Sequence, residues 1–240
     1  METVIIVAGG TGSRFGGNMP KQFLPLCGKP VLMHTIDAFR SALPGSEIVV
    51  VLSDAMRGFW EELCREYGFE SPRIAEGGTT RWESVKNAVC SLSDTPAGSI
   101  VLIHDGARPL VSCDVIRKTA AYARNTDGAL PVVDITDSLR KMDADGVGSE
   151  PVDRSDYRSV QTPQAFSLWR LREAYALPYQ SDFTDDASVM AAAGFGNIVL
   201  VEGSRENIKI TTPIDLKIAE IILEERNAQK RCGNTNSRIE

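Results

Sequence analysis

The chain has 240 residues, a hydrophobic fraction of 42% and a formal net charge of −6. This length and composition can bury one large core, and the negative charge argues against a general nucleic-acid surface. No apolar run approaches the roughly eighteen residues of a membrane span, and no basic segment precedes an apolar one at the N-terminus. The five cysteines form no C-x-x-C pair, which is typical of reduced thiols. We therefore expect a cytoplasmic protein that binds neither membranes nor nucleic acid.

A glycine-rich loop follows the first predicted strand. The apolar, partly β-branched residues 4–8 are typical of a buried strand, which opens into the segment GGTGSRFG at residues 9–16. The backbone N–H groups of such a loop can bind an anion. Arg14 adds a planar guanidinium that can bind two phosphate oxygens, and Lys21 adds a compact ammonium group. The loop therefore favours a phosphate ligand.

The spacing of the glycines separates this loop from two known phosphate-binding patterns. Glycines at positions 10, 12 and 16 follow G-x-G-x-x-x-G rather than the G-x-G-x-x-G of dinucleotide folds, and no G-x-x-x-x-G-K-[ST] occurs. The alternative without a ligand is a tight turn that carries two solvated cations. The sequence PKQF at residues 20–23 favours the functional interpretation.

Strands and helices alternate from residue 31 to residue 133. Strands are expected at residues 47–52, 73–75, 99–104 and 129–133. Helices are expected at residues 31–40 and 54–67, and two more begin at Thr80 and at Ser112 or Asp114. Thr80 would be an N-cap, and Glu83 would complete a capping box. This alternation implies right-handed βαβ crossovers. We therefore expect a single α/β domain with a mostly parallel, covered sheet.

Residues 134–158 break this alternation. The segment is rich in Asp, Ser and Gly, and Asp143-Ala144-Asp145-Gly146 predicts a hairpin turn. It has too few apolar residues to form a core of its own. A mobile surface loop is one interpretation, but an insertion of this length is usually functional.

The C-terminal part returns to helices and strands. The expected elements are a helix at residues 167–176, the acidic N-terminus of a second helix at residues 184–186, strands at residues 198–202 and 207–211, and a last helix from Thr212-Pro213. For the acidic residues at 184–186, a plain cap is favoured over a catalytic role. After Glu225 the apolar spacing stops, so residues 226–240 are expected to form a polar tail that frays.

Six sequence motifs occur in one order along the chain. They are AGGTGSRFG with PKQF (8–16 and 20–23), GGTTRWESV (77–85), HDGARP (104–109), QTPQ (161–164), TDDAS (184–188) and NIKIT (207–211). Together they resemble the 2-C-methyl-D-erythritol 4-phosphate cytidylyltransferase family of the non-mevalonate isoprenoid pathway. The resemblance implies a Rossmann-like nucleotidyltransferase domain over residues 1–225, a tail at 226–240, and transfer of CMP from CTP to 2-C-methyl-D-erythritol 4-phosphate. It also implies that residues 134–158 form a protruding β-arm, which completes the neighbour's substrate site in a homodimer.

The resemblance also implies roles for individual residues. Arg14 and Lys21 would stabilise the transition state at the triphosphate, and Lys209 would place the attacking phosphate. Arg154, in VDR at residues 152–154, would grip that phosphate from the partner subunit. Nucleotide contacts are implied for Ala8, Gly9, Gly10, Gly12, Gly78 and Ser84, and substrate contacts for Asp105, Arg108, Ser138, Arg154, Thr162 and Lys209.

Such a reaction needs charge neutralisation more than a general base. The attacking phosphate monoester is already ionised at neutral pH, because its second pKa is about 6. The chain has two histidines, His34 and His104, and no convincing Ser-His-Asp or Cys-His set. Negative charge builds on the phosphoryl oxygens, so cations and a divalent metal are the natural solution.

Asp105 is the candidate metal ligand. It follows a predicted strand at the carboxyl edge, where ligands of open α/β sheets bind. We expect it to contact Mg²⁺ or a substrate hydroxyl, since Mg²⁺ takes one or two carboxylates together with substrate phosphates. The alternative is a turn carboxylate that binds nearby backbone N–H groups. His104 is expected to be a hydrogen-bonded strand residue, and Arg108 to contact the substrate or to pair with Asp105.

Two departures from the family pattern concern the substrate site. The usual HDAARP is HDGARP here, which adds backbone freedom beside Asp105. The usual threonine at the entry to the arm is replaced by Ser138, and Thr136 is the alternative substrate contact.

Two other functions remain open at this point. Ribitol 5-phosphate cytidylyltransferase shares the glycine loop, PKQF and QTPQ, whereas TDDAS and VDR favour the methylerythritol enzyme. A non-catalytic nucleotide-binding module would have lost Arg14, Lys21 or Lys209, and all three are present.

Overall fold

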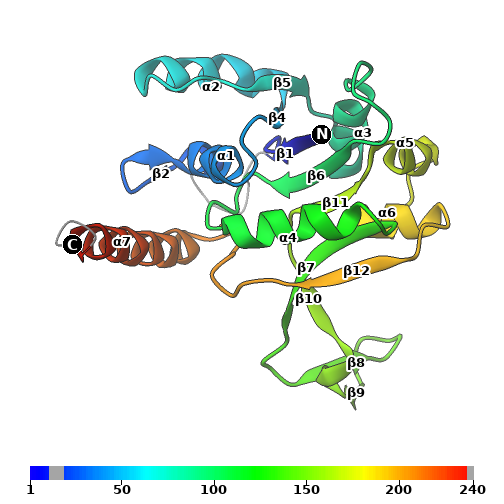
Figure 1. Ribbon diagram of the computed structural model, residues 1–240. Helices are drawn as coiled ribbons and strands as arrows, with labels where there is room; N and C mark the ends of the chain where they lie inside the picture. The colour runs from blue at the N-terminus through cyan, green and yellow to red at the C-terminus, as the bar shows by residue number, and fades with distance from the viewer. Residues whose placement is uncertain (11–18, 237–240) are drawn as a thin grey trace.

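An eight-stranded sheet forms the centre of the molecule (Figure 1). The computed structural model describes residues 1–10 and 19–236, with side chains up to Gln229. The strands follow the order β10-β7-β11-β6-β1-β4-β5, and β12 also pairs with β7. Their bounds are Glu2–Val7 (β1), Glu47–Leu52 (β4), Arg73–Glu76 (β5), Ile100–Asp105 (β6), Gly128–Asp134 (β7), Arg158–Val160 (β10), Gln164–Ser167 (β11) and Ile198–Glu202 (β12).

The half of the sheet that contains β1 is parallel. β1 lies between β4 and β6 and pairs with both in parallel, and β4 pairs with β5 in the same way. β12 is parallel to β7, whereas β11 and β10 run antiparallel to their neighbours. The apolar runs that predicted β1 and β4 are almost completely buried, as expected of strands covered on both faces. The expected α/β fold with a mostly parallel sheet is confirmed.

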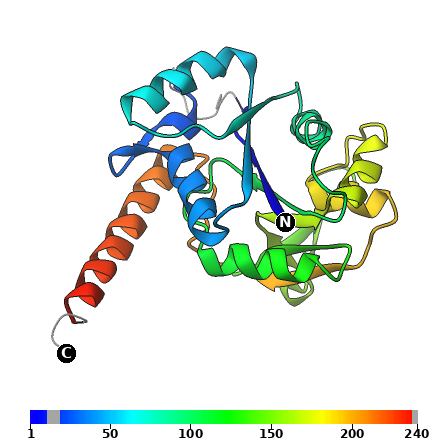
Figure 2. The same ribbon diagram turned by 45° about the horizontal axis from the view of Figure 1, so that its top comes forward.

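Helices cover both faces of this sheet. Their bounds are Val31–Ala42 (α1), Asp54–Glu66 (α2), Arg81–Cys90 (α3), Cys113–Ala123 (α4), Leu168–Ala176 (α5) and Asp186–Ala192 (α6). One core contains Phe39 of α1, Trp60 of α2 and Ile116 of α4 against one face of the sheet. A second core contains Val85 of α3 and Leu171 of α5 against the other face. The last helix, α7 (Pro213–Asn236), extends away from the body (Figure 2).

The insertion forms a separate two-stranded arm. β8 (Leu139–Met142) and β9 (Ser149–Val152) pair antiparallel and project beyond the main sheet (Figure 1). The predicted turn joins them, with Gly146 N donating to Asp143 O at 3.0 Å. Gly146 has a φ of 72°, a left-handed conformation that glycine adopts without strain. A 3-10 helix, η3 (Arg154–Asp156), leads the chain back to β10.

Several details differ from the sequence predictions. Residues 207–211 are not a strand, because their backbone groups bond to scattered partners, such as Ile210 N to Ala107 O at 2.9 Å. β11 was not predicted, since four buried residues are too short to show a period. The helix that was expected to end near Glu225 continues through Asn236. Residues 237–240 of the expected tail lie outside the described residues.

Candidate active site

Two adjoining cavities open at the carboxyl ends of β1 and β6. The first has a volume of about 220 Å³ and the second of about 320 Å³. Arg81, Asp105 and Lys209 line both cavities, so one group of charged side chains forms the wall between them. This position agrees with the rule that open α/β sheets bind ligands beyond the carboxyl ends of their strands.

Gln22 anchors the described start of the glycine loop. It is buried within the short helix η2 (Lys21–Phe23), and its Nε2 donates to Ala8 O at 2.6 Å and to Gly10 O at 3.2 Å. These two bonds tie PKQF to the loop that ends β1 and bring Lys21 to the first cavity. We did not predict the role of Gln22, because a single glutamine carries no distinct sequence signal.

A second loop closes the opposite side of the first cavity. Ser84, at the start of α3, accepts from Gly78 N at 3.0 Å and donates to Thr80 O at 2.9 Å. Thr80 caps α3 as expected, since its side chain accepts from Glu83 N. The predicted capping box is shifted by one residue, because the Glu83 carboxylate binds the N–H and hydroxyl of Thr79, both at 2.7 Å. The loop is therefore held in place by its own side chains.

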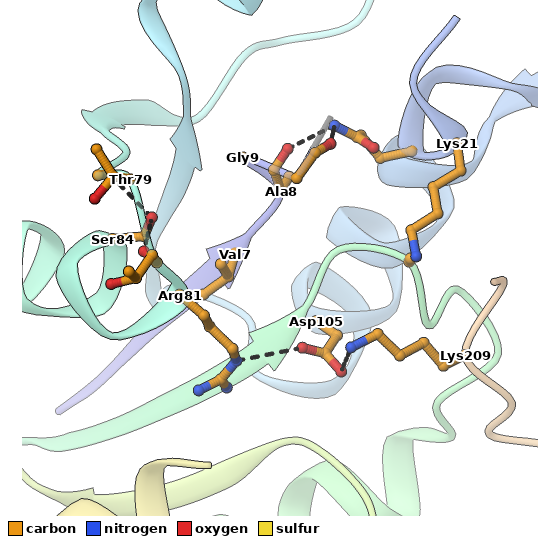
Figure 3. A pocket seen from close by; sticks show the side chains of 14 residues that line it. Val7, Ala8, Gly9, Lys21, Thr79, Arg81, Ser84, Asp105 and Lys209 are labelled. Atoms are coloured by element: carbon orange, nitrogen blue, oxygen red, sulfur yellow. Dashed lines mark hydrogen bonds and ion pairs between the residues drawn. The ribbon is translucent and has the colours of Figure 1, made fainter. Parts of the chain in front are cut away.

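Asp105 lies among three cations. Its carboxylate is 3.0 Å from Lys209 Nζ, 3.2 Å from Arg108 Nε and 3.8 Å from Arg81 Nε. Figure 3 shows Arg81 and Lys209 approaching Asp105 from opposite sides, with Lys21 pointing toward the same space. Burial by itself would raise the pKa of Asp105, but the attraction of the three cations outweighs it and holds that pKa well below its usual range. The carboxylate is therefore ionised, and both of its oxygens have cationic partners.

A chain of hydrogen bonds fixes the backbone of Asp105. Thr162 Oγ1 accepts a hydrogen bond from Asp105 N at 3.1 Å and lies 2.9 Å from His104 Nδ1. The other ring nitrogen, His104 Nε2, lies 3.1 Å from Arg108 O. A neutral imidazole with its proton on Nε2 satisfies all of these partners. Burial lowers the pKa of His104 to about 4, which agrees with this neutral form. His104 is thus a hydrogen-bonded strand residue, as predicted.

Arg81 is a site residue that the sequence analysis missed. Its guanidinium binds both carboxylate oxygens of Asp186 and also faces Asp105. The two acids come from segments distant in sequence, and Arg81 to Asp186 spans 105 positions. The neighbouring Asp185 caps α6 in a complete capping box with Ser188, so the preference for a plain cap at that residue agrees with the structure.

The structure brings most of the predicted site residues together. Those that line the first cavity are Ala8, Gly9, Gly10, Lys21, Gly78, Ser84, Asp105 and Lys209. Arg108 and Thr162 line the second cavity. Gly12 and Arg14 lie outside the described residues. Ser138 and Arg154 are on the arm and line neither cavity of their own chain. Arg154 Nη1 donates a hydrogen bond to Thr136 O, which links the two chain segments at the base of the arm.

Comparison with known proteins identifies the family. A family model described as 2-C-methyl-D-erythritol 4-phosphate cytidylyltransferase matches residues 2–225. The chain belongs to this family. It is 47% identical over 223 residues to the protein of that name from Bacteroides thetaiotaomicron, which covers 92% of this chain and 99% of the relative. It is also 39% identical over 226 residues to the one from Bacillus thuringiensis, covering 93% of this chain and 98% of the relative.

Solved structures of the family share the fold. The crystal structure of the family member from Thermus thermophilus is 33% identical and covers 92% of this chain and 98% of its own, with a TM-score of 0.69. The Francisella tularensis structure is 30% identical and covers 91% of this chain and 97% of its own, with a TM-score of 0.74. The chain is therefore an enzyme, a CTP-dependent cytidylyltransferase, and the ribitol 5-phosphate alternative is not favoured. Among the described residues, no helix has both the length and the apolar composition needed to cross a membrane.

Proposed function

We propose that the chain transfers CMP from CTP to 2-C-methyl-D-erythritol 4-phosphate, releasing pyrophosphate, with the nucleotide in the first cavity and the polyol phosphate in the second. The observation that carries this proposal is the charged wall of Arg81, Asp105 and Lys209, which both cavities share. Two anions that must react need cations at the point where they meet. A wall of this kind lies where the α-phosphate and the attacking phosphate would approach each other.

The two loops around the first cavity suit a cytidine nucleotide. Backbone groups of Ala8, Gly9 and Gly10 face the cavity on one side, and Gly78 with Ser84 on the other. A side chain at position 78 would place its Cβ 2.2 Å from Glu83 Cγ, so the loop depends on glycine there. Small residues let the backbone approach the base closely, which suits a pyrimidine, because a larger purine would clash there. Gly12 would extend the nucleotide contacts.

The phosphates would be held by cations from both cavities. Lys21 and Arg14 would neutralise the triphosphate as charge develops at its α-phosphorus. Lys209 would bind the attacking phosphate, because its amine lies at the boundary of the two cavities. Arg108 and Thr162 would contact the polyol from the wall of the second cavity.

A divalent cation would take the place of Lys209 beside Asp105. This residue is the one carboxylate in the described lining of the first cavity, and its low pKa keeps it charged. Mg²⁺ typically binds one or two carboxylates and completes its shell with substrate phosphates and water. Asp105 would hold the ion, which would then supply further neutralisation of the triphosphate.

The arm supports a homodimer with shared active sites. Ser138 and Arg154 lie on the arm away from the cavities of their own chain. Several apolar side chains in this part of the molecule are exposed, namely Met142, Val147, Tyr157, Val160 and Leu200. A partner subunit would cover them and would receive Arg154, with Ser138 or Thr136, at its polyol phosphate.

The four described cysteines are free thiols, which supports a cytoplasmic location.

The test of the function is pyrophosphate release from CTP with each polyol phosphate. We expect release with 2-C-methyl-D-erythritol 4-phosphate and at least a hundredfold lower kcat/KM with ribitol 5-phosphate, since pockets discriminate between related substrates by about 10²- to 10⁵-fold. Equal rates with the two substrates would contradict the proposed specificity. Binding of CTP without release from either would instead support a non-catalytic nucleotide-binding module.

A further inference from the structure

Arg81, whose side chain lines both cavities, is anchored by residues that line neither of them. Its Nη1 and Nη2 donate to Asp186 Oδ1 and Oδ2 at 2.9 and 2.6 Å, a bidentate pair. Asp186 is fully buried and also accepts from Tyr175 Oη at 2.6 Å. Burial opposes the charge of Arg81, but attraction to Asp186 outweighs it, so the pKa of Arg81 lies above its ordinary value. Arg81 is therefore a fixed charge.

The three cations around Asp105 differ in how firmly they are held. Arg81 is bound to Asp186, and Arg108 Nη1 donates to Asn207 O at 2.8 Å. The side chain of Lys209 is 40% exposed, compared with 31% for Arg81 and 14% for Arg108. Lys209 is thus the cation of this group that solvent and ligands reach most easily.

A departure of Lys209 would not leave Asp105 unpaired. Removing one partner of a buried ion pair is costly, because the other charge stays buried without compensation. Asp105 avoids this cost, since Arg81 and Arg108 remain beside its two oxygens. Lys209 can then bind a phosphate without strong competition from the carboxylate.

We propose that Arg81 is a positioning residue, held by Asp186, which keeps Asp105 in place so that Lys209 can leave this carboxylate for the phosphate of the polyol substrate. The inference rests on the proposed function and adds a residue that acts through Asp105 and Lys209. Arg81 selectively supports binding of the second substrate. Arg81 also lines the first cavity, but the side that we assign to cytidine is formed by the glycine loop, Gly78 and Ser84, so we expect CTP binding to depend on Arg81 much less.

The Asp186→Asn variant tests this inference. Asparagine keeps the shape of the side chain but replaces one acceptor oxygen by an NH₂ group that faces the guanidinium, which breaks the bidentate pair. We expect KM for 2-C-methyl-D-erythritol 4-phosphate to rise about tenfold, which corresponds to the loss of one charge-assisted hydrogen bond. KM for CTP should change by less than about twofold. A purely structural role would lower thermal stability without this split. Tyr175→Phe should shift the same KM in the same direction by about twofold.

Asp127→Asn is the matched control. Asp127 Oδ1 pairs with Arg170 Nε at 3.2 Å, both side chains are 23% exposed, and neither residue lines the two cavities. The chemical change is the same, but the pair is unconnected to Asp105. We expect both KM values of this variant to equal those of the wild type.

The outcomes separate the two proposals. If the wild type releases no pyrophosphate with the polyol phosphate, the proposed function is wrong. If the wild type is active and Asp186→Asn changes both KM values equally, or neither, the inference on Arg81 is overturned. Should Asp186→Asn fail to fold, Arg81→Lys keeps the charge but cannot bond both Asp186 oxygens, so it should show the same split. Wild-type KM values in that variant would equally overturn the inference.

Discussion

Lys209 and Asp105 form an ion pair of 3.0 Å between the loop that follows β12 and the end of β6. The pair joins the two residues to which we assign the attacking phosphate and the divalent cation. We expect the two residues to exchange this contact for the divalent cation and the substrate phosphate, each of which offers the opposite charge.

Asp105→Asn should raise the Mg²⁺ concentration that gives half-maximal activity by about tenfold, since asparagine keeps the shape but loses the charge that attracts the ion. Titration of activity with Mg²⁺ at saturating CTP measures this effect. An unchanged Mg²⁺ dependence would reassign Asp105 to binding a substrate hydroxyl or to a structural turn.

Lys21→Ala should lower kcat far more than it weakens CTP binding. Negative charge grows at the phosphoryl oxygens mainly in the transition state, so a cation near them stabilises the transition state more than the bound substrate. Loss of one such donor typically costs about a hundred- to a thousandfold in kcat. Steady-state kinetics and calorimetric titration with CTP check the two parts. A near-normal kcat with only a raised KM for CTP would contradict this role.

Gln22→Met should weaken CTP binding and reduce stability together. Methionine keeps the volume but removes the donor to Gly10 O and to the buried Ala8 O, and a buried unsatisfied carbonyl costs about 1–3 kcal/mol. Denaturant unfolding gives the free-energy change, and calorimetry gives the affinity for CTP. If the unfolding free energy stays at the wild-type value, Gln22 does not anchor the glycine loop.

A mixture of two inactive variants should recover activity if the active sites are shared between subunits. In a mixed dimer of Arg154→Ala with Lys21→Ala, one composite site carries both defects and the other carries neither. Random reassortment of equal amounts makes half of the dimers mixed, so we expect about a quarter of wild-type activity.

Subunit exchange must be confirmed first, with two differently tagged chains that co-purify. Once exchange is established, zero recovery would place Arg154 in the site of its own subunit.

His104 should make the protein less stable in mild acid. Burial lowers its pKa to about 4 from 6.5, so the unfolded chain takes up the proton first as pH falls. This contribution to stability is complete above pH 6.5, declines between pH 6.5 and about 4, and amounts to roughly 3 kcal/mol. Urea unfolding of the wild type and of His104→Gln at pH 8 and pH 5 isolates the effect of His104. His34 titrates in both proteins, so its effect cancels in the comparison. Equal pH dependence in the two would show that His104 is not held neutral.

Local sequence signals predicted the fold class and most of its elements. The apolar runs of β1 and β4 indicated buried strands, and Asp143 to Gly146 indicated the turn of the arm. These signals are readable because burial on both faces and a left-handed turn each restrict residue type within a few positions. The six motifs carried the family resemblance and most of the residues that line the cavities.

The tertiary structure decided how distant residues meet. The sequence does not show that Arg81 pairs with Asp186, that Gln22 holds Ala8, or that three cations surround Asp105. Residues 207–211 have the composition of a strand, yet their partners come from other loops. Such contacts depend on the order of the strands in the sheet, and local propensity carries no information about which chain segments the fold places side by side.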